Sequence, residues 1–190
     1  MLVTLEEAAA GFSIAIVLAV ILAVLMDNIT LVRKAVYPFV VVSQTIPTIT
    51  LAPLFVLWFG LGLLPKVIVV ILTCFFPITI SLVEGLASVD QDMVSMMRSM
   101  GATGFQIMKH VKLPASLTSF FSGLKIAATY SIMGAVIGEW LGGEKGLGIY
   151  IQRTKHSYDL RGTFAAIIVI VVLSMLLFKL ITVAQDIMMP

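Results

Sequence analysis

Histidine, cysteine and the carboxylates are the side chains that could carry reaction chemistry in this chain of 190 residues, and they are few. His110 and His156 are the two histidines, Cys74 is the one cysteine, and aspartate and glutamate together number 10. Catalysis needs a nucleophile with a base, a pair of carboxylates or a set of metal ligands. No long apolar stretch has an acidic residue in its middle. We therefore expect neither a catalytic site nor a metal site, and we interpret Cys74 as a packing residue.

The composition places most of the chain in lipid. Hydrophobic residues make up 60% of it, charged residues 12%, and the mean hydropathy is +1.12. Soluble domains average about 45–50% apolar and about 25% charged residues. The net charge of +2 argues against a nucleic-acid-binding protein, and one cysteine cannot form a disulfide within the chain. The sequence predicts an integral membrane protein.

Several apolar runs are long enough to cross a bilayer, which takes roughly 20 residues. They are residues 8–26, 35–65, 67–83, 119–138 and 162–178, and Glu6 and Glu7 precede the first. The second run exceeds one crossing, so we expect it to tilt, kink or include interfacial residues. The predicted fold is all-α: a single domain, residues 1–190, forming a polytopic transmembrane helical bundle of about five spans.

Lysine and arginine in the connections predict the orientation, because cytoplasmic connections carry the excess of these residues. With five crossings the two chain ends lie on opposite sides of the cell membrane. Seven of the 12 basic residues fall on one side: Arg33, Lys34, Arg98, Lys109, Lys112, Lys125 and Lys179. We predict that this side is cytoplasmic, with the N-terminus outside and the C-terminus inside. His110 and His156 then lie on opposite sides, which argues further against an intramembrane enzyme.

The polar interruption between the third and fourth runs is the segment most suggestive of function. Ser88 or Asp90 can cap a helix in which methionines recur at helical spacing, at positions 93, 96, 97 and 100. Gly101 and Gly104 break that helix, and Pro114 ends a second apolar face at positions 105, 107, 108 and 111. We expect two short amphipathic helices at the cytoplasmic membrane face. They could be interfacial anchors, or the methionines could dock in a partner's groove.

Polar side chains within the second run are candidates for the lining of a solute path. They are Ser43, Gln44, Thr45 and Thr48, followed by Thr50, with Pro47 and Pro53 interrupting the backbone hydrogen bonds. Such groups in hydrocarbon face other helices or a cavity. The alternative is ordinary helix packing through serine and threonine. Gln44 is the best single candidate, because its amide needs partners at both ends.

Glu139 follows the fourth run at the outer boundary, beside Trp140. It could gate a path or contact a binding protein, whereas a carboxylate at a helix end is more commonly solvated. The glycines at 142, 143, 146 and 148 indicate a flexible turn. Tyr150, Tyr158 and the charges between residues 153 and 161 form an outer helix or loop that is a candidate docking surface for a soluble binding protein.

The spacing from Gly101 to Pro114 resembles the EAA loop of ABC importer permeases, whose pattern is E-A-A, three residues, Gly, nine residues, I-x-L-P. Here nine residues separate Gly101 from the V-K-L-P sequence that ends at Pro114. Residues 44–62, 65–86 and 138–151 are similar to the nitrate/sulfonate/taurine branch, which includes permeases for thiamine precursors and riboflavin. Ser95, Met96 and Met97 stand where the family has E-A-A. Members of this branch usually have a further N-terminal crossing, so the resemblance implies that this chain is a short form, a fragment or the product of a later start codon.

The resemblance implies that the loop, about residues 88–114, is a coupling element seated on a cytoplasmic ATPase dimer. Its implied contact residues are Ser95, Met96, Met97, Arg98, Gly101, Gly104, Leu113 and Pro114. The partner ATPase would bind ATP and Mg²⁺, because this chain has no G-x-x-x-x-G-K-[ST] phosphate loop and needs no cofactor of its own. The implied assembly adds an extracytoplasmic solute-binding protein and a second permease copy, as a homodimer in the bilayer.

The substrate implied by the resemblance is a small organic solute, most closely a thiamine pyrimidine precursor or a related vitamin. Sulfonate, taurine and nitrate are the alternatives within the branch. A different class is an ion-coupled secondary carrier, which needs an acidic or broken-helix site at the midplane of the membrane. The prolines could break helices, but no carboxylate is placed to bind a proton or cation there.

Overall fold

The computed structural model describes residues 1–189, and within them the chain is helical with no strand. The elements are α1 (Leu2–Asn28), α2 (Thr30–Ser43), α3 (Thr48–Phe59), α4 (Leu63–Ala87), α5 (Gln91–Ser99), α6 (Gly104–Ile107), the π-helical turn η1 (Met108–Lys112), α7 (Leu113–Gly142), α8 (Leu147–His156) and α9 (Leu160–Met188). Four helical segments in this part of the chain are long and apolar enough to cross a membrane, or five if the bent pair α2 and α3 counts as one span. The predicted fold class is confirmed.

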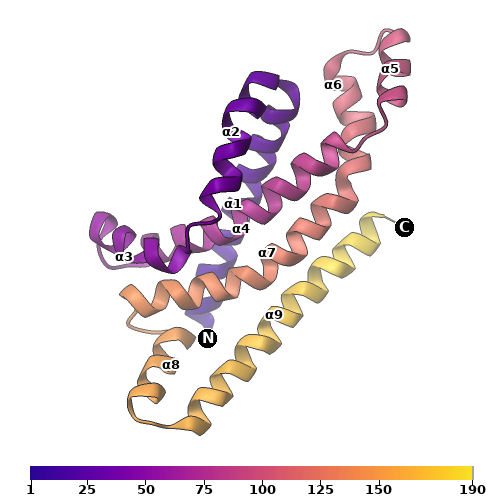
Figure 1. Cartoon of the computed structure of the whole chain (residues 1–190). Helices are drawn as coiled ribbons and strands as arrows, with labels where there is room; N and C mark the ends of the chain where they lie inside the picture. Colours follow the sequence, from indigo (N-terminus) through magenta and orange to yellow (C-terminus); the bar gives the residue numbers. More distant parts are fainter. Residues whose placement is uncertain (190) are drawn as a thin grey trace.

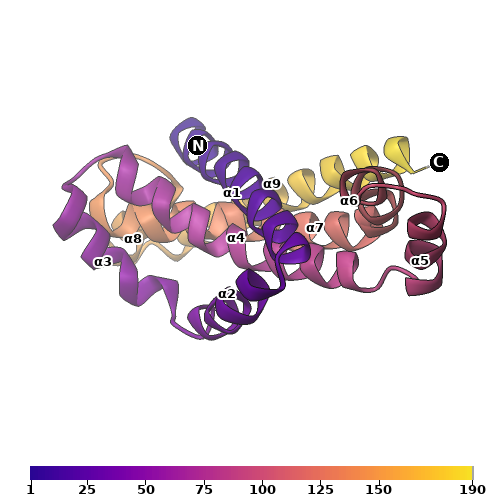
Figure 2. The same cartoon turned by 90° about the horizontal axis from the view of Figure 1, so that it is seen from above.

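The long helices α1, α4, α7 and α9 form an elongated bundle with short helices at its two ends. The helices α5 and α6 lie at one end, and α8 and the N-terminus lie at the other (Figure 1). Seen from above, α4 and α7 lie at the centre, with α9 on one side and α2 and α3 on the other (Figure 2). His110 in η1 and His156 in α8 therefore lie at opposite ends, as the sequence predicts.

The centre of the bundle is built on close packing by small residues. Gly11, Ala15, Ala19 and Ala23 recur every fourth position of α1, and all are buried. A Cβ atom at Gly11 would overlap the side chain of Val70 on α4. Such a stripe lets two helix backbones approach closely, which is how apolar helices gain contact in lipid. Cys74 belongs to the same core, as expected of a packing residue.

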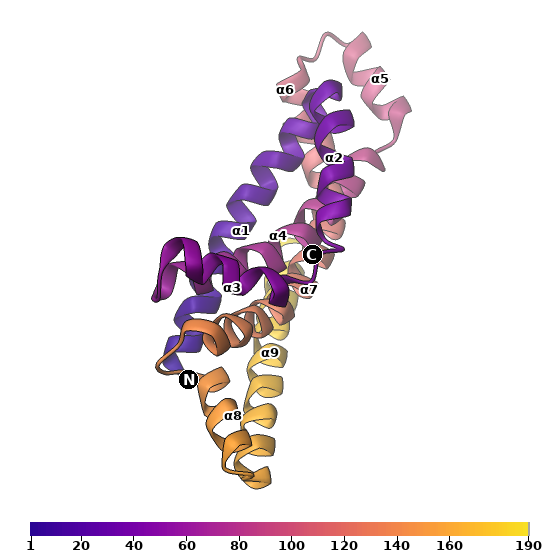
Figure 3. The same ribbon diagram turned by 60° about the vertical axis from the view of Figure 1, so that its left-hand side comes forward.

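The second apolar run is divided into two helices rather than one tilted span. The axes of α2 and α3 differ by 100° across the break after Ser43. Pro47 is the N-cap residue of α3, and it cannot supply the backbone N–H that a continuous helix would use. Figure 3 shows α3 running across the bundle while α2 runs along it. The expectation of a kink is confirmed, and the kink is sharp enough to turn the chain sideways.

Two boundaries differ from the sequence-based expectation. Pro114 does not end the second amphipathic helix, because residues 104–142 form one continuous helical segment. The N–H of Leu113 reaches back to the carbonyl of Met108, and this π-type turn widens the helix just before the residue that has no N–H. Also, α1 begins at Leu2, so Glu6 and Glu7 lie inside its first turns rather than before it.

A charged residue of the fourth apolar run, Lys125, lies where α7 packs against α9. The ammonium of Lys125 on α7 lies 5.8 Å from the centre of the Phe178 ring on α9. A cation over an aromatic face is attracted by the ring electrons, which makes the position tolerable in an apolar setting. Most of α9 is exposed, which is appropriate for a helix that faces lipid.

Candidate functional site

An apolar surface at the α5–α6 end is the first candidate site. Asp90, and not Ser88, caps α5 by accepting a hydrogen bond from the backbone of Asp92. Four large side chains on α5, at its C-cap and on α6 are open to solvent, and we call them the methionine surface: Met93, Met96, Met100 and Phe105. The most exposed are Met100 and Phe105, each at 76%. Exposed apolar groups of this kind mark a binding face, and methionine adapts its shape to a partner.

The predicted apolar faces of the two short helices differ from the observed ones. Met97 is only partly exposed, because it packs against a small core beneath the methionine surface. That core contains Val89, Val94, Ile107 and Val111. Phe105 points outward, although the sequence places it on the same apolar face as Ile107. Helical spacing groups Met97 with the other methionines and Phe105 with Ile107, but burial divides both groups, since Met97 and Ile107 contact the small core whereas Met96 and Phe105 are exposed.

The connection between α5 and α6 is a defined turn. Gly101 has φ of 84°, a left-handed backbone conformation that favours glycine. Thr103 then opens α6 with a capping box, in which its hydroxyl accepts from the Gln106 backbone and Gln106 accepts from the Thr103 backbone. Met97, Met100, Gly101, Ala102, Gln106 and His110 surround a hollow of about 320 Å³.

The remaining predicted coupling residues lie around this turn. Ser95, Arg98 and Gly104 are exposed, so they can reach a partner. Leu113 is partly buried and packs toward Met108 and α4, whereas Pro114 is exposed. The structure thus groups the predicted residues at one end of the molecule, with Met97 and Leu113 supporting the surface from within.

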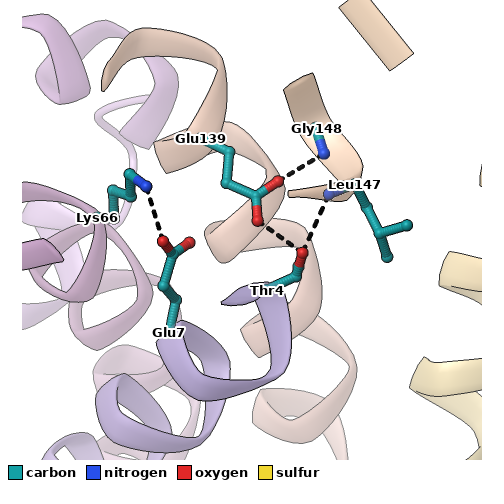
Figure 4. A network of polar contacts seen from close by, with 6 residues as sticks. All are labelled: Thr4, Glu7, Lys66, Glu139, Leu147 and Gly148. Atoms are coloured by element: carbon teal, nitrogen blue, oxygen red, sulfur yellow. Dashed lines mark hydrogen bonds and ion pairs between the residues drawn. The ribbon is translucent and has the colours of Figure 1, made fainter. Parts of the chain in front are cut away.

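A buried polar network at the opposite end is the second candidate site (Figure 4). The Thr4 hydroxyl donates to Glu139 Oε1 at 2.6 Å and accepts from the backbone N–H of Leu147 at 3.1 Å. Glu139 Oε2 accepts from the backbone N–H of Gly148 at 2.5 Å. These contacts join the ends of α1, α7 and α8, and a carboxylate at the N-terminus of α8 is favoured by the helix dipole.

Glu139 is therefore not the solvated carboxylate that its position at a helix end predicts. Its side chain is fully buried, because α1 and the start of α8 cover it. The glycine turn between α7 and α8 is specific rather than simply flexible. Gly146 has φ of 133°, and a Cβ atom there would overlap the Glu139 carboxylate. Gly148 lies inside α8.

A buried ion pair that the sequence analysis missed lies beside this network (Figure 4). Lys66 Nζ on α4 lies 2.8 Å from Glu7 Oε1 on α1, and both residues are buried. Glu7 Oε2 has no hydrogen-bond partner among residues 1–189. A cavity of about 700 Å³ adjoins the pair and is lined in part by Trp140 and Gln152. The available signal was the placement of each charge beside an apolar run, which does not reveal that the two pair.

The predicted path residues lie together at the break between α2 and α3. Gln44 and Thr45 are exposed, and Ser43 and Thr48 are partly buried. The hydroxyls of Ser43 and Thr45 donate to carbonyls one turn back in the chain. The Gln44 amide makes no hydrogen bond among the described residues, so it is free to contact a solute or another chain. Glu139 belongs to the separate network described above.

These features define a class of protein: a polytopic α-helical membrane protein with an exposed apolar surface at one end and a buried polar network that joins three helices at the other. The chain belongs to the family of binding-protein-dependent transport system inner membrane components, whose model matches residues 11–190. The resemblance to this family is confirmed.

Individual relatives agree with this family. The Formylaminopyrimidine transport permease protein ThiX of Halalkalibacterium halodurans is 41% identical over 187 residues, which cover 98% of this chain and 75% of the relative. The Riboflavin transport system permease protein RibX of Chloroflexus aurantiacus is 33% identical over 153 residues, 80% of this chain and 57% of the relative. A chain of the MetNI methionine ABC transporter in an inward-facing conformation has the same fold, with a TM-score of 0.79 at 22% identity, over 98% of this chain and 91% of that one.

Proposed function

We propose that this chain is the permease subunit of an ATP-driven ABC importer that moves a thiamine pyrimidine precursor or a related vitamin. The observation that carries the substrate class is the 41% identity, across nearly the whole chain, to a formylaminopyrimidine permease. Relatedness at this level supports a shared solute class more strongly than the fold does, because one fold serves many solutes.

The methionine surface is the proposed docking site for the cytoplasmic ATPase. It is apolar, it stands clear of the long helices, and Arg98 beside it can contact the rim of a groove. Closure of the ATPase dimer on bound ATP and Mg²⁺ would push on α5, and the core beneath it would pass the push to η1 and α7. The permease would then act as a transducer and a path, with ATP hydrolysis confined to the partner.

The distribution of basic residues supports the proposed orientation, and the exposed face of α2 and α3 supports the proposed assembly. The end that carries α5 and α6 holds Arg98, Lys109 and Lys112, and we place it in the cytoplasm with the C-terminus, leaving the N-terminus outside the cell. The α8 end would then face an extracytoplasmic binding protein. A second permease copy would face α2 and α3, where Leu57 and Trp58 are exposed and where the break holds Ser43, Gln44, Thr45 and Thr48. Two such breaks would line a central path.

The test is uptake of labelled formylaminopyrimidine by cells that express this chain with its ATPase and binding protein. We expect uptake that stops when the ATPase is inactivated by mutation and that persists when the ion gradient is collapsed. Excess riboflavin, taurine or nitrate serves as the competitor that defines the substrate class. Uptake that survives loss of the ATPase but not loss of the ion gradient would overturn the proposal in favour of a secondary carrier.

A further inference from the structure

The helix α1 is bonded at both of its ends. Asp27 lies in its last turn, and both carboxylate oxygens of Asp27 accept from Lys112 Nζ, at 2.9 and 2.8 Å. Thr4 and Glu7 lie in its first turns and bond to Glu139 and Lys66. These are the two ion pairs found among residues 1–189, and α1 takes part in both.

Lys112 is the last residue of η1, so the Asp27 contact reaches the root of the coupling loop. On one side of η1, Ile107 and Val111 pack against Val89 and Val94, which hold α5 in place. On the other side, Met108 packs with Met26 of α1 and Leu86 of α4. A movement of α5 would therefore be transmitted to α1 through a few side chains, by both an apolar contact and an ion pair.

The Asp27–Lys112 pair is more than an exposed surface contact. The side chains are 9% and 19% exposed, respectively, and the ammonium donates to both oxygens of the carboxylate. Removing one member of such a pair leaves the other as a poorly solvated charge. Exposed pairs, in contrast, contribute little because water screens them.

The far end of α1 meets three elements at once. The 27 residues of α1 make a rod of roughly 40 Å at about 1.5 Å a residue. At its far end α1 forms hydrogen bonds with Lys66 of α4, with Glu139 of α7 and with the backbone N–H of Leu147 at the start of α8. Displacement of α1 along its axis would therefore strain the bonds that hold the start of α8.

We propose that the Asp27–Lys112 ion pair makes α1 a strut, which carries movement of the coupling loop to the buried network that holds α8. Asp27 and Lys112 are positioning residues in this scheme, since neither touches the solute or ATP. The inference rests on the proposed function, because it assumes that the ATPase docks on α5 and α6.

The experiment uses the complex of this chain with its ATPase and binding protein in liposomes. Asp27→Asn and Lys112→Gln each break the pair, and Asp27→Lys with Lys112→Asp reverses it. The double variant Asp27→Asn with Lys112→Gln removes both charges and leaves no unpaired ion, so it retains the fold. Lys109→Gln is the matched control, since exposed Lys109 lies on the same turn and forms no ion pair within the described residues. The readout is formylaminopyrimidine transported per ATP hydrolysed.

We expect this ratio to fall about tenfold in the neutral double variant, which is within the usual range of coupling between two sites. The ATPase should still copurify with this variant. The reversed pair should restore most of the ratio, and Lys109→Gln should not change it. A neutral double variant that couples as the native chain does would overturn the strut and leave the proposed function standing. Absence of ATP-dependent transport by the native complex would overturn both proposals.

Discussion

The buried charged side chains of this molecule are paired with residues that are distant in sequence. Glu7 and Lys66 are separated by the whole of α2 and α3, and Glu139 contacts Thr4 although the two residues are 135 positions apart. In the sequence each of these residues is a charge beside an apolar run, and such a side chain is ordinarily expected to be solvated. The pairing depends on how α1 packs against α4 and α7, which no local pattern encodes. The structure therefore buries three charges that local sequence places in solvent, two as an ion pair and one in a neighbouring set of hydrogen bonds.

The Glu7–Lys66 pair gives a prediction at this scale. Lys66→Met alone should destabilise the permease by about 3–5 kcal/mol, because it leaves the Glu7 carboxylate buried without its counter-ion. Glu7→Leu combined with Lys66→Met should recover most of that loss, because an apolar pair needs no solvation. The measurement is thermal unfolding of the purified protein in detergent. Equal destabilisation by the single and the double variant would show that the pair does not act as a unit.

Helices were more predictable than the faces they present. The apolar runs located α1, α4, α7 and α9, because each is long enough to dominate its own hydropathy. The length of the second run predicts a tilt, a kink or interfacial residues, and the choice of a sharp kink depends on packing of α3 against α4 and α7. Pro114 was read as a helix end, whereas the π turn η1 lets the helix pass through it. Periodicity cannot tell which methionine of a short helix packs on a core, so the partial burial of Met97 is known only from the structure.

The two sides of α5 should respond differently to charge. Met100→Glu places a carboxylate on the methionine surface, so it should reduce copurification of the ATPase by about tenfold or more while leaving thermal stability unchanged. Met97→Glu should instead lower stability, because Met97 packs on the core formed with Val94 and Ile107. The assay is pull-down of the ATPase with a tagged permease. Loss of binding with Met97→Glu only, in a folded protein, would place the docking face on the other side of α5.

The two ends of the molecule differ: one exposes the methionine surface, and the other contains the buried polar network. The long helices separate the two ends by the thickness of a membrane, since four of them meet the length and hydropathy of a span. Sequence predicted this polarity from the polar interruption between two runs. It could not predict which short helix would be exposed and which would be tied down, because α8 is fixed by contacts to the first turns of α1.

The orientation of this body is testable with a single reactive site at each end. Cys74 is the one cysteine of the chain, so Cys74→Ala provides a background without thiols. In that background Ser157→Cys, after α8, should react with a membrane-impermeant maleimide on intact cells, whereas Ser99→Cys, on α5, should react only after lysis. Both serines are exposed. The reverse pattern of labelling would place the N-terminus in the cytoplasm.

The small-residue stripe of α1 has a consequence for how the helix is registered along its axis. Gly11, Ala15, Ala19 and Ala23 offer α4 a nearly smooth surface of hydrogen atoms and methyl groups. Val70 of α4 interrupts that surface, because its side chain occupies the space that a Cβ atom at Gly11 would need. This fit, together with the polar contacts at its two ends, sets the position of α1 along its axis.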